Sequence, residues 1–240
     1  MTSILSIVRK EMRSYFNSPI AYIVIVFFLV FTAVWLFYVA QFVVRDTASL
    51  RAYFGIMPIV FIGFIPALTM RSWAEEYKLG TEEILLTLPY RESELVLGKF
   101  FGAYGLLLLV ILLTVFVPFS VTPLGNFERG EIFGEYLGIA LLGAAGTAIG
   151  LFVSSIARNQ VSAFILSAVA LLFLTLVGQV NTIVDLPTWM ASVVNYVSLQ
   201  YHVQSFIRGV VDTRDLIYFF VITVLFLYLN VKALVFRKWS

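Results

Sequence analysis

The dipeptide Gly98-Lys99 is the nearest approach in this sequence to a phosphate-binding motif. A Walker A loop has the form G-x-x-x-x-G-K-[ST], in which backbone N–H groups and the lysine surround the phosphates of a nucleotide. In this chain Phe100 follows the lysine, and Ser93 stands at the position of the first glycine. We therefore expect that the chain does not bind ATP through such a loop.

Few other residues could perform catalysis or bind a metal ion. The 240 residues contain no cysteine and one histidine, His202, so thiolate chemistry and clusters of histidine or cysteine ligands are excluded within this sequence. No nucleophile is visibly paired with a base, and the middles of the apolar segments carry no ionisable residue that would indicate a proton or ion relay. We expect no catalytic residue, no metal site and no cofactor in this chain.

The charged residues are concentrated in the interval from Met70 to Lys99. Ten of them lie in this short stretch, against 16 Lys and Arg and 14 Asp and Glu in the whole sequence. The segments on both sides are too apolar to face water, so any function performed in water is expected here. The ten residues are Arg71, Glu75, Glu76, Lys78, Glu82, Glu83, Arg91, Glu92, Glu94 and Lys99.

The composition indicates a membrane protein. Hydrophobic residues make up 61% of the chain and charged residues 12%, and the mean hydropathy is +0.97. Soluble domains are about 25% charged, and apolar runs long enough to cross a bilayer as helices recur along this chain. We predict an all-α polytopic protein with one transmembrane domain (1–240) and six spans, at residues 20–44, 54–70, 95–117, 132–156, 161–180 and 216–236.

The first 18 residues place apolar side chains among basic ones, so a helix over residues 1–18 would have one apolar side and one basic side. This pattern is typical of an amphipathic helix that lies on the membrane surface. The alternative is that the cations are only the positive flank of the first span. Under the first interpretation the basic side consists of Arg9, Lys10 and Arg13.

The distribution of basic residues predicts the orientation of the chain. Six spans place both termini on the same side of the membrane. With the amino terminus in the cytoplasm, 11 of the 16 Lys and Arg residues fall in cytoplasmic segments, as the positive-inside rule requires. We predict that both termini and the polar segment 71–94 are cytoplasmic.

The fourth predicted span is rich in small residues. Gly146 and Gly150 have GxxxG spacing, and Ala140, Ala144 and Ala148 form a row with the same spacing, so another helix could approach the backbone closely. The approaching helix could belong to the same chain or to a second subunit. Packing within the chain is the favoured interpretation.

The polar interval has a helical pattern of its own, interrupted at Gly80. Thr81 can cap a short helix, Glu82 lies in its first turn, where a carboxylate suits the helix dipole, and Pro89 can end it. Such a helix would have an apolar ridge and a rim of glutamates, a surface suited to docking a soluble partner. A solvated loop whose charges keep it out of the bilayer is an equal alternative. The ridge would consist of Trp73, Tyr77, Ile84 and Leu88.

The segment 181–215 mixes polar and large apolar residues. It has too many polar side chains for a lipid-facing span and too many large apolar ones for a solvated loop. Pro187 suits the first turn of a helix, and Gly209 suits a C-terminal stop. We predict one or two half-helices that dip into the outer face of the bilayer, where they would pack against protein or line a water-filled cavity.

Several runs of this sequence resemble a known family, the permeases of ABC-2 type transporters. Within that family the chain is most similar to the permease of the bacterial gliding-motility ABC transporter, and M-R-S-W-A-E-E is the most telling run. The resemblance covers nearly the whole chain. The matching runs are R-S-W-A-E-E-Y-K-L-G-T-E-E-I-L-L-T-L-P followed by L-V-L-G-K-F, then I-A-R-N-Q, and then F-I-R-G-V-V-D-T-R-D.

The resemblance implies a division of labour between subunits. This chain would be catalytically silent, and ATP and Mg²⁺ would bind to a separate ATPase subunit. Two permeases, identical or different, and two ATPases would form the working unit in a bacterial inner membrane, without any nucleic acid. A coupling helix of this chain would seat in the ATPase, and its residues would be Arg71, Glu75, Glu76, Gly80, Thr81, Glu82, Leu85 and Pro89.

The resemblance also implies an outer gate and a further partner. The segment 181–215 would form the extracytoplasmic gate. Gliding-type permeases are commonly associated with a companion membrane protein that has a large extracytoplasmic domain, so an auxiliary subunit of this kind is expected. The gate residues would be Trp189, Asn195, His202 and Arg208.

Three functions are compatible with these observations. The first is ATP-driven export of a substrate through the membrane. In the second, the same complex transmits force to an extracytoplasmic partner and transports nothing. In the third, the chain is a membrane scaffold or a secondary transporter that needs no ATPase.

Overall fold

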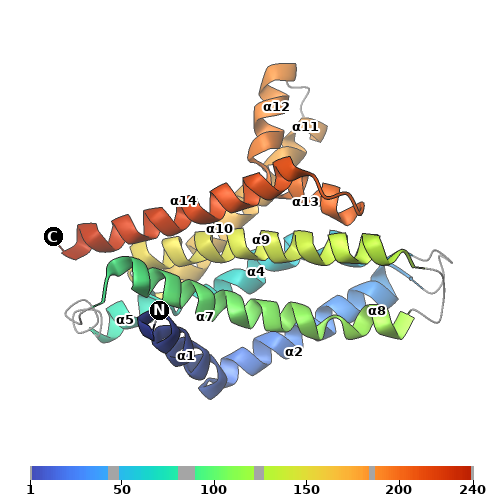
Figure 1. Cartoon of the computed structure of the whole chain (residues 1–240). Helices are drawn as coiled ribbons and strands as arrows, with labels where there is room; N and C mark the ends of the chain where they lie inside the picture. Colours follow the sequence, from blue (N-terminus) through green and yellow to red (C-terminus); the bar gives the residue numbers. More distant parts are fainter. Residues whose placement is uncertain (1, 43–48, 81–89, 122–126, 184–186, 239–240) are drawn as a thin grey trace.

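The structure is a computed structural model that describes residues 2–42, 49–80, 90–121, 127–183 and 187–238. Every element of secondary structure within these ranges is a helix (Figure 1), which confirms the all-α prediction for them. In chain order the elements are α1 (Thr2–Asn17), α2 (Pro19–Val34), η1 (Trp35–Val39), α3 (Arg51–Gly55), α4 (Met57–Thr69), α5 (Ala74–Leu79), α7 (Glu92–Leu113), α8 (Phe116–Val121), α9 (Arg129–Ile156), α10 (Gln160–Leu176), η3 (Val177–Gln179), α11 (Val180–Ile183), α12 (Thr188–Val197), α13 (Leu199–Ile207) and α14 (Thr213–Lys238).

Six helical stretches are long and apolar enough to cross a membrane, as predicted. Long helices of this kind satisfy their backbone hydrogen bonds internally, which the hydrocarbon core requires. The first, fifth and sixth stretches are mostly exposed on the surface of the single chain, whereas the fourth is the most deeply buried. The stretches are Ala21–Val39, Met57–Leu79, Glu92–Val121, Arg129–Ile156, Gln160–Gln179 and Thr213–Arg237.

The first span ends before residue 44, where the sequence analysis placed its limit. Helix α2 passes into the π-helical turn η1, which ends at Val39. Gln41 then has a φ of 50°, in the left-handed region that an L-residue rarely adopts, so the helix cannot continue. The predicted start of the second span, at residue 54, likewise falls in the separate short helix α3.

Helix α9 lies at the centre of the bundle, and its glycines let neighbouring helices of the same chain approach it. A Cβ atom added to Gly146 would lie 2.5 Å from Cδ1 of Ile65, and one added to Gly150 would lie 2.4 Å from Oγ1 of Thr69. Both contacts are with α4. The small residues of the fourth span therefore serve packing within the chain, which was the favoured interpretation.

Helix α1 crosses the beginning of α7 at one end of the bundle, beside α5 (Figure 1). Two glycines one helical turn apart make this crossing possible. A Cβ atom on Gly98 would lie 2.5 Å from Cγ2 of Ile7, and a Cβ atom on Gly102 would lie 2.6 Å from Cβ of Glu11. The helix predicted for residues 1–18 thus has a basic side, and another of its sides packs closely against the glycines of α7.

Two short helices, α12 and α13, occupy most of the segment that follows the fifth span. Pro187 is the residue before α12, and Gly209, with a φ of 76°, follows the end of α13, so both residues stand where the sequence analysis placed a start and a stop. The hairpin of α11 and α12 projects away from the bundle (Figure 1). No residue of α12 is buried.

Candidate functional site

The most distinctive polar feature of the described structure is a buried lysine, Lys99, in the second turn of α7. Its side chain is only 2% exposed. The Nζ atom donates hydrogen bonds to the carbonyl oxygen of Ser72 (2.6 Å), to Oε1 of Glu76 (2.8 Å) and to Oε1 of Glu11 (3.0 Å). An ammonium group has three donors, so these three acceptors satisfy it completely. We call these four residues the Lys99 cluster.

The Lys99 cluster joins α7, which carries the lysine, to α1 and to the polar interval. Glu11 belongs to α1, Glu76 belongs to α5, and Ser72 lies in the turn between α4 and α5. A buried ion is tolerated only when it is paired, and removal of one partner from such a pair typically costs about 3–5 kcal/mol. The amphipathic helix, the polar interval and the third span are therefore held together through one ammonium group.

The polar interval is anchored to the bundle on its other side by Ser154 of α9. The hydroxyl of Ser154 accepts hydrogen bonds from the backbone N–H groups of Trp73 (3.2 Å) and Ala74 (3.4 Å) at the start of α5. Trp73 is buried, and its ring lies 4.7 Å from Nζ of Lys99. Helix α5 ends at Gly80, whose φ of 66° places it in the left-handed region. This confirms the predicted break at Gly80, where glycine is the residue without a steric penalty.

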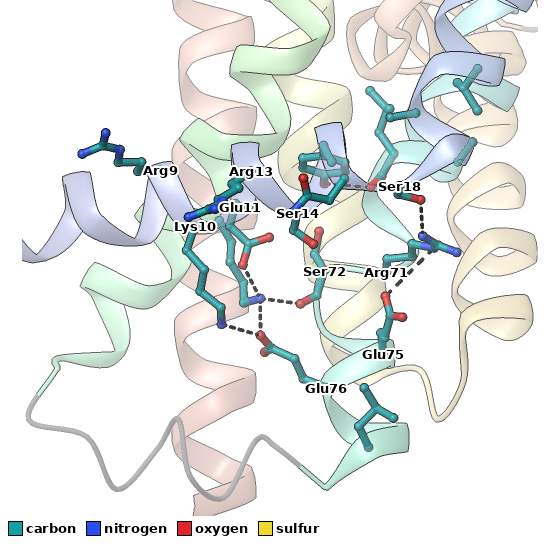
Figure 2. Close-up of a pocket in the computed structure, with 18 of the residues that line it drawn as sticks. Arg9, Lys10, Glu11, Arg13, Ser14, Ser18, Arg71, Ser72, Glu75 and Glu76 are labelled. Carbon is teal, nitrogen blue, oxygen red and sulfur yellow. Dashed lines mark hydrogen bonds and ion pairs between the residues drawn. The ribbon is translucent and has the colours of Figure 1, made fainter.

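A cavity of about 880 Å³ lies between α1, α2, α4 and α5, next to the Lys99 cluster (Figure 2). Nη1 of Arg71 donates to the hydroxyl of Ser18 (2.9 Å) across this cavity, and Nε of Arg71 lies 4.0 Å from Oε2 of Glu75. Tyr15 donates to the carbonyl oxygen of Leu68 (2.9 Å). Burial, with a smaller contribution from Glu11, raises the pKa of Tyr15, so its phenol remains a donor.

The structure separates the predicted coupling residues into two groups. Arg71, Glu75 and Glu76 line the cavity beside α1, and Gly80 follows directly at the end of α5. The rest of the predicted short helix lies outside the described residues, and its named members are Thr81, Glu82, Leu85 and Pro89.

The predicted rim of glutamates needs one correction. The side chain of Glu76 is 14% exposed and turns inward to Lys99, whereas the prediction placed it on an exposed docking rim. The sequence pattern missed this because the partner lies 23 positions away, in the next span. The described half of the predicted apolar ridge also packs inward, since Trp73 is buried in a cluster with Leu95 and Phe100 and Tyr77 packs against it. The other half, Ile84 and Leu88, lies outside the described residues.

The three basic residues of α1 have different surroundings. Lys10 lies 3.7 Å from Oε1 of Glu76, but its side chain is 60% exposed, so this ion pair is weak. Arg9 and Arg13 are exposed, line the cavity and form no ion pair with a described residue. Arg9 points away from the Lys99 cluster (Figure 2).

The four predicted gate residues do not gather at one place. Trp189 is 69% exposed on the projecting hairpin, and Arg208 is exposed at the end of α13. Asn195 accepts a hydrogen bond from Nδ2 of Asn181 (2.7 Å), which closes the hairpin. His202 alone is buried, with Nδ1 2.6 Å from Oδ1 of Asp215 at the start of α14.

Ionisable residues were expected to be absent from the middles of the spans, and the structure buries two of them nearer the ends of spans. Lys99 is buried near the start of the third span, and Glu135 is buried near the start of the fourth. Both carboxylate oxygens of Glu135 lack a hydrogen-bond partner among the described residues. One turn earlier, Glu131 pairs with Arg51 of α3.

The sequence pattern showed Gly98 and Lys99 as a failed nucleotide-binding motif and Lys99 as one charge of the polar interval, but it assigned no partner to the lysine. A signal for the Lys99 cluster was nevertheless present, because Gly98 and Gly102 have GxxxG spacing around a lysine inside an apolar span. Such spacing predicts a close helix crossing, and a charge beside it predicts a partner on the crossing helix. In the described part of the chain, no group of three or more histidine, aspartate or glutamate side chains is placed to hold a metal ion.

Comparison with known proteins agrees with the membrane architecture. Residues 45–232 match the family described as ABC-2 family transporter protein. The chain is also 28% identical over 187 residues to the probable multidrug ABC transporter permease YbhS of Escherichia coli, from strain K12 and from O157:H7. These alignments cover 77% of this chain and 49% of the relatives, so the chain spans about half the length of the curated relatives it matches. Because the family match extends over most of its residues, this chain belongs to the ABC-2 family of transporter proteins.

Proposed function

We propose that this chain is the membrane permease subunit of an ABC transporter and couples ATP hydrolysis by a separate ATPase subunit to export across a bacterial inner membrane. The observation that carries the proposal is the Lys99 cluster, which fastens α1 and α5 to the third span. A push on either short helix would move α7 as well, because separating them would leave buried charges without partners. The family match and the permease relatives support the same role.

The coupling surface would consist of the exposed side of α5 and the residues that follow Gly80. Glu75 and Lys78 are the charged side chains of α5 that remain open to a partner. Gly80 would act as the joint between α5 and the segment with Thr81, Glu82, Leu85 and Pro89. In this proposal the polar interval and both termini face the cytoplasm, two permeases and two ATPases form the complex, and ATP and Mg²⁺ bind to the ATPases alone.

A second function, force transmission without transport, is favoured by one feature of the structure. The hairpin of α11 and α12 projects from the bundle, and α12 has no buried residue, although it carries large apolar side chains such as Trp189 and Tyr196. An auxiliary subunit with an extracytoplasmic domain would cover these side chains. The gliding-motility type of permease, which the sequence resembles, belongs to this proposal.

Reconstitution of the complex distinguishes the two functions. The tagged chain is purified with its ATPase subunit and placed in vesicles, and ATP hydrolysis and ATP-dependent uptake of ethidium are measured together. Ethidium is a suitable first probe because the related YbhS protein is described as a probable multidrug permease. ATP-dependent uptake supports export. ATP hydrolysis without movement of ethidium or any other tested solute supports force transmission.

Two substitutions test whether coupling passes through α5 and the residues after it. Glu75→Lys combined with Thr81→Arg adds positive charge to the proposed surface, leaves the bond between Glu76 and Lys99 in place, and should abolish retention of the ATPase. Arg129→Gln, an exposed change at the opposite end of the bundle, is the control and should have no effect. If the wild-type chain never retains an ATPase subunit, or if the double variant functions normally, the chain is a scaffold or a secondary transporter.

A further inference from the structure

The cavity beside the Lys99 cluster has an excess of positive charge. Five cationic side chains line it, against three carboxylates. The carboxylates are already engaged, since Glu11 and Glu76 pair with Lys99 and Glu75 lies beside Arg71. The cations are Arg9, Lys10, Arg13, Arg71 and Lys99. The cavity therefore keeps an excess of positive charge after these pairings are counted.

Arg71 has a donor that the protein leaves unused. Its side chain is 30% exposed, Nη1 donates to Ser18, and Nε forms no hydrogen bond within the described structure. The carboxylate of Glu75 is 4.0 Å away, beyond hydrogen-bonding distance. A phosphate oxygen is the acceptor that a guanidinium group binds best, through parallel N–H donors. The hydroxyl groups of Ser14 and Ser18 line the same cavity and could donate to further oxygens.

One wall of the cavity is apolar. Ala21 and Val24 of α2 and Ala67 and Leu68 of α4 contribute to it. Helix α2 continues from this wall into a span that is mostly exposed on the surface of the chain. An elongated ligand could thus place a charged end among the arginines and an apolar end along α2. The volume of about 880 Å³ lies within the range of about 300–1,000 Å³ that is usual for ligand sites.

We propose that this cavity binds an anionic phospholipid of the surrounding membrane, with its phosphate between Arg13 and Arg71 and an acyl chain along Val24 and Leu68. A free phosphate would use the cations but would leave the apolar wall in water. Basic pockets between membrane-spanning helices are suited to lipid headgroups. The bound lipid would brace α1 against α2 and α4, and so hold the amphipathic helix in the position from which Glu11 reaches Lys99.

Native mass spectrometry of the full chain, released from a neutral detergent, tests the proposal. The protein is incubated with dioleoylphosphatidylglycerol, which is anionic, or with dioleoylphosphatidylcholine, which has no net charge. Wild type should retain the anionic lipid preferentially. The double variant Arg13→Gln with Arg71→Gln should retain about tenfold less of it, since each cation near an anionic lipid contributes to binding.

A matched control removes the same charge elsewhere. Arg129→Gln with Arg214→Gln changes two exposed arginines at the other end of the bundle and should retain the lipid as wild type does. A second variant, Ala67→Phe, keeps every charge but fills the apolar wall, and it should also lose the lipid. If thermal unfolding shows that the double variant does not fold, Ala67→Phe is used for the test instead.

Four outcomes would overturn the proposal. Equal retention of the two lipids would show that charge does not select the ligand. Unchanged retention in both the double variant and Ala67→Phe would place the lipid elsewhere. Displacement of the lipid by inorganic phosphate at about 10 mM would show that the site binds a soluble anion. Displacement by the purified ATPase subunit would assign the cavity to protein docking. None of these measurements requires transport, so the proposal can fail while the proposed function stands.

Discussion

The two ends of the bundle each hold a buried polar cluster, and the clusters differ in the side chain at their centre. At the end with α1, the ammonium of Lys99 joins α1 and α5 to α7. At the opposite end, the imidazole of His202 joins α13 to α14 through Asp215, and its Nε2 atom lies 3.0 Å from the carbonyl oxygen of Tyr196 in α12. Both clusters fasten short helices to a long one (Figure 1).

The two clusters are held together by different kinds of interaction. The ammonium of a lysine keeps its charge throughout the physiological pH range, so the Lys99 cluster opens only when its members are moved apart. A histidine ring has two nitrogen atoms, and each of them can take part in a hydrogen bond. Both nitrogen atoms of His202 face oxygen atoms, so the ring links Asp215 to the carbonyl group of Tyr196. The first cluster is held by a buried charge, whereas the second is held by hydrogen bonds on two sides of one ring.

Removing the lysine should have the largest effect. Lys99→Met keeps the length of the side chain but leaves Glu11 and Glu76 buried without their cation. We expect a loss of about 3–5 kcal/mol in the free energy of unfolding, measured in detergent, because an unpaired buried charge is costly. In the reconstituted complex the variant should hydrolyse ATP with little ethidium uptake.

Two variants make this prediction specific. Lys78→Met removes an exposed lysine of α5 and should change the free energy of unfolding by less than about 0.5 kcal/mol. Combining Lys99→Met with Glu11→Gln and Glu76→Gln should recover part of the lost stability, because neutral amides are cheaper to bury than carboxylates. If Lys99→Met is as stable as wild type, the ammonium does not hold the three elements together.

The contrast between the clusters also shows what the sequence could predict. The spans were predictable because hydropathy is a local property, and the end of α5 was predictable because Gly80 adopts a backbone conformation that favours glycine. The pairing of Lys99 with Glu11 was not, since it joins residues 88 positions apart and depends on how α1 crosses α7. Even the pairing of His202 with Asp215, 13 positions apart, depends on the turn at Gly209.

The candidate site was therefore recovered only in part. Sequence reasoning located the polar interval and named Glu76, but it placed the carboxylate of Glu76 on an exposed surface. Helical spacing tells which side chains share a face, and it does not tell which neighbouring element covers that face. The GxxxG spacing of Gly98 and Gly102 would have supplied the missing information about the covering element. It marks the face of α7 that another helix approaches.

Breaking the second cluster should have a smaller effect than breaking the first. Asp215→Asn removes the carboxylate opposite Nδ1 of His202, but an amide can still form a hydrogen bond with the ring. We expect a loss of about 1–3 kcal/mol in the free energy of unfolding, the range for a disturbed buried hydrogen bond. Asp212→Asn is the control, because asparagine can still accept from the backbone N–H of Arg214. A loss equal to that of Lys99→Met would remove the distinction between the two clusters.

The state of the imidazole can be observed directly, since His202 is the only histidine in the sequence. In ¹⁵N spectra of the wild-type chain near neutral pH, Nε2 should carry a proton that is donated to Tyr196. An Nε2 atom without a proton would place two acceptors against each other and would contradict the assignment. The same resonance should change in Asp215→Asn and stay the same in Lys99→Met, which would establish that the clusters are independent.

Separating α1 from α7 without changing any charge tests the glycine crossing. Gly102→Val introduces a side chain whose Cβ would lie 2.6 Å from Cβ of Glu11. The variant should lose about 1–3 kcal/mol of stability, the usual cost of overpacking. Gly105→Val, where a Cβ would lie 3.7 Å from Sδ of Met12, should be tolerated better. Equal effects of the two substitutions would show that Glu11 can move with α1 while it keeps its bond to Lys99.

The smallest effect is expected at the edge of the Lys99 cluster. Lys10→Gln removes the second cation near Glu76, at 3.7 Å, but the side chain of Lys10 is largely exposed and Lys99 remains. The free energy of unfolding should fall by less than about 1 kcal/mol, and the difference from wild type should vanish in high salt, which screens exposed charges. The loss caused by Lys99→Met should persist in high salt, because a buried charge is screened much less. If both losses respond equally to salt, the buried lysine is reached by solvent, and the cluster at this end would be as easily opened as the one at the other end.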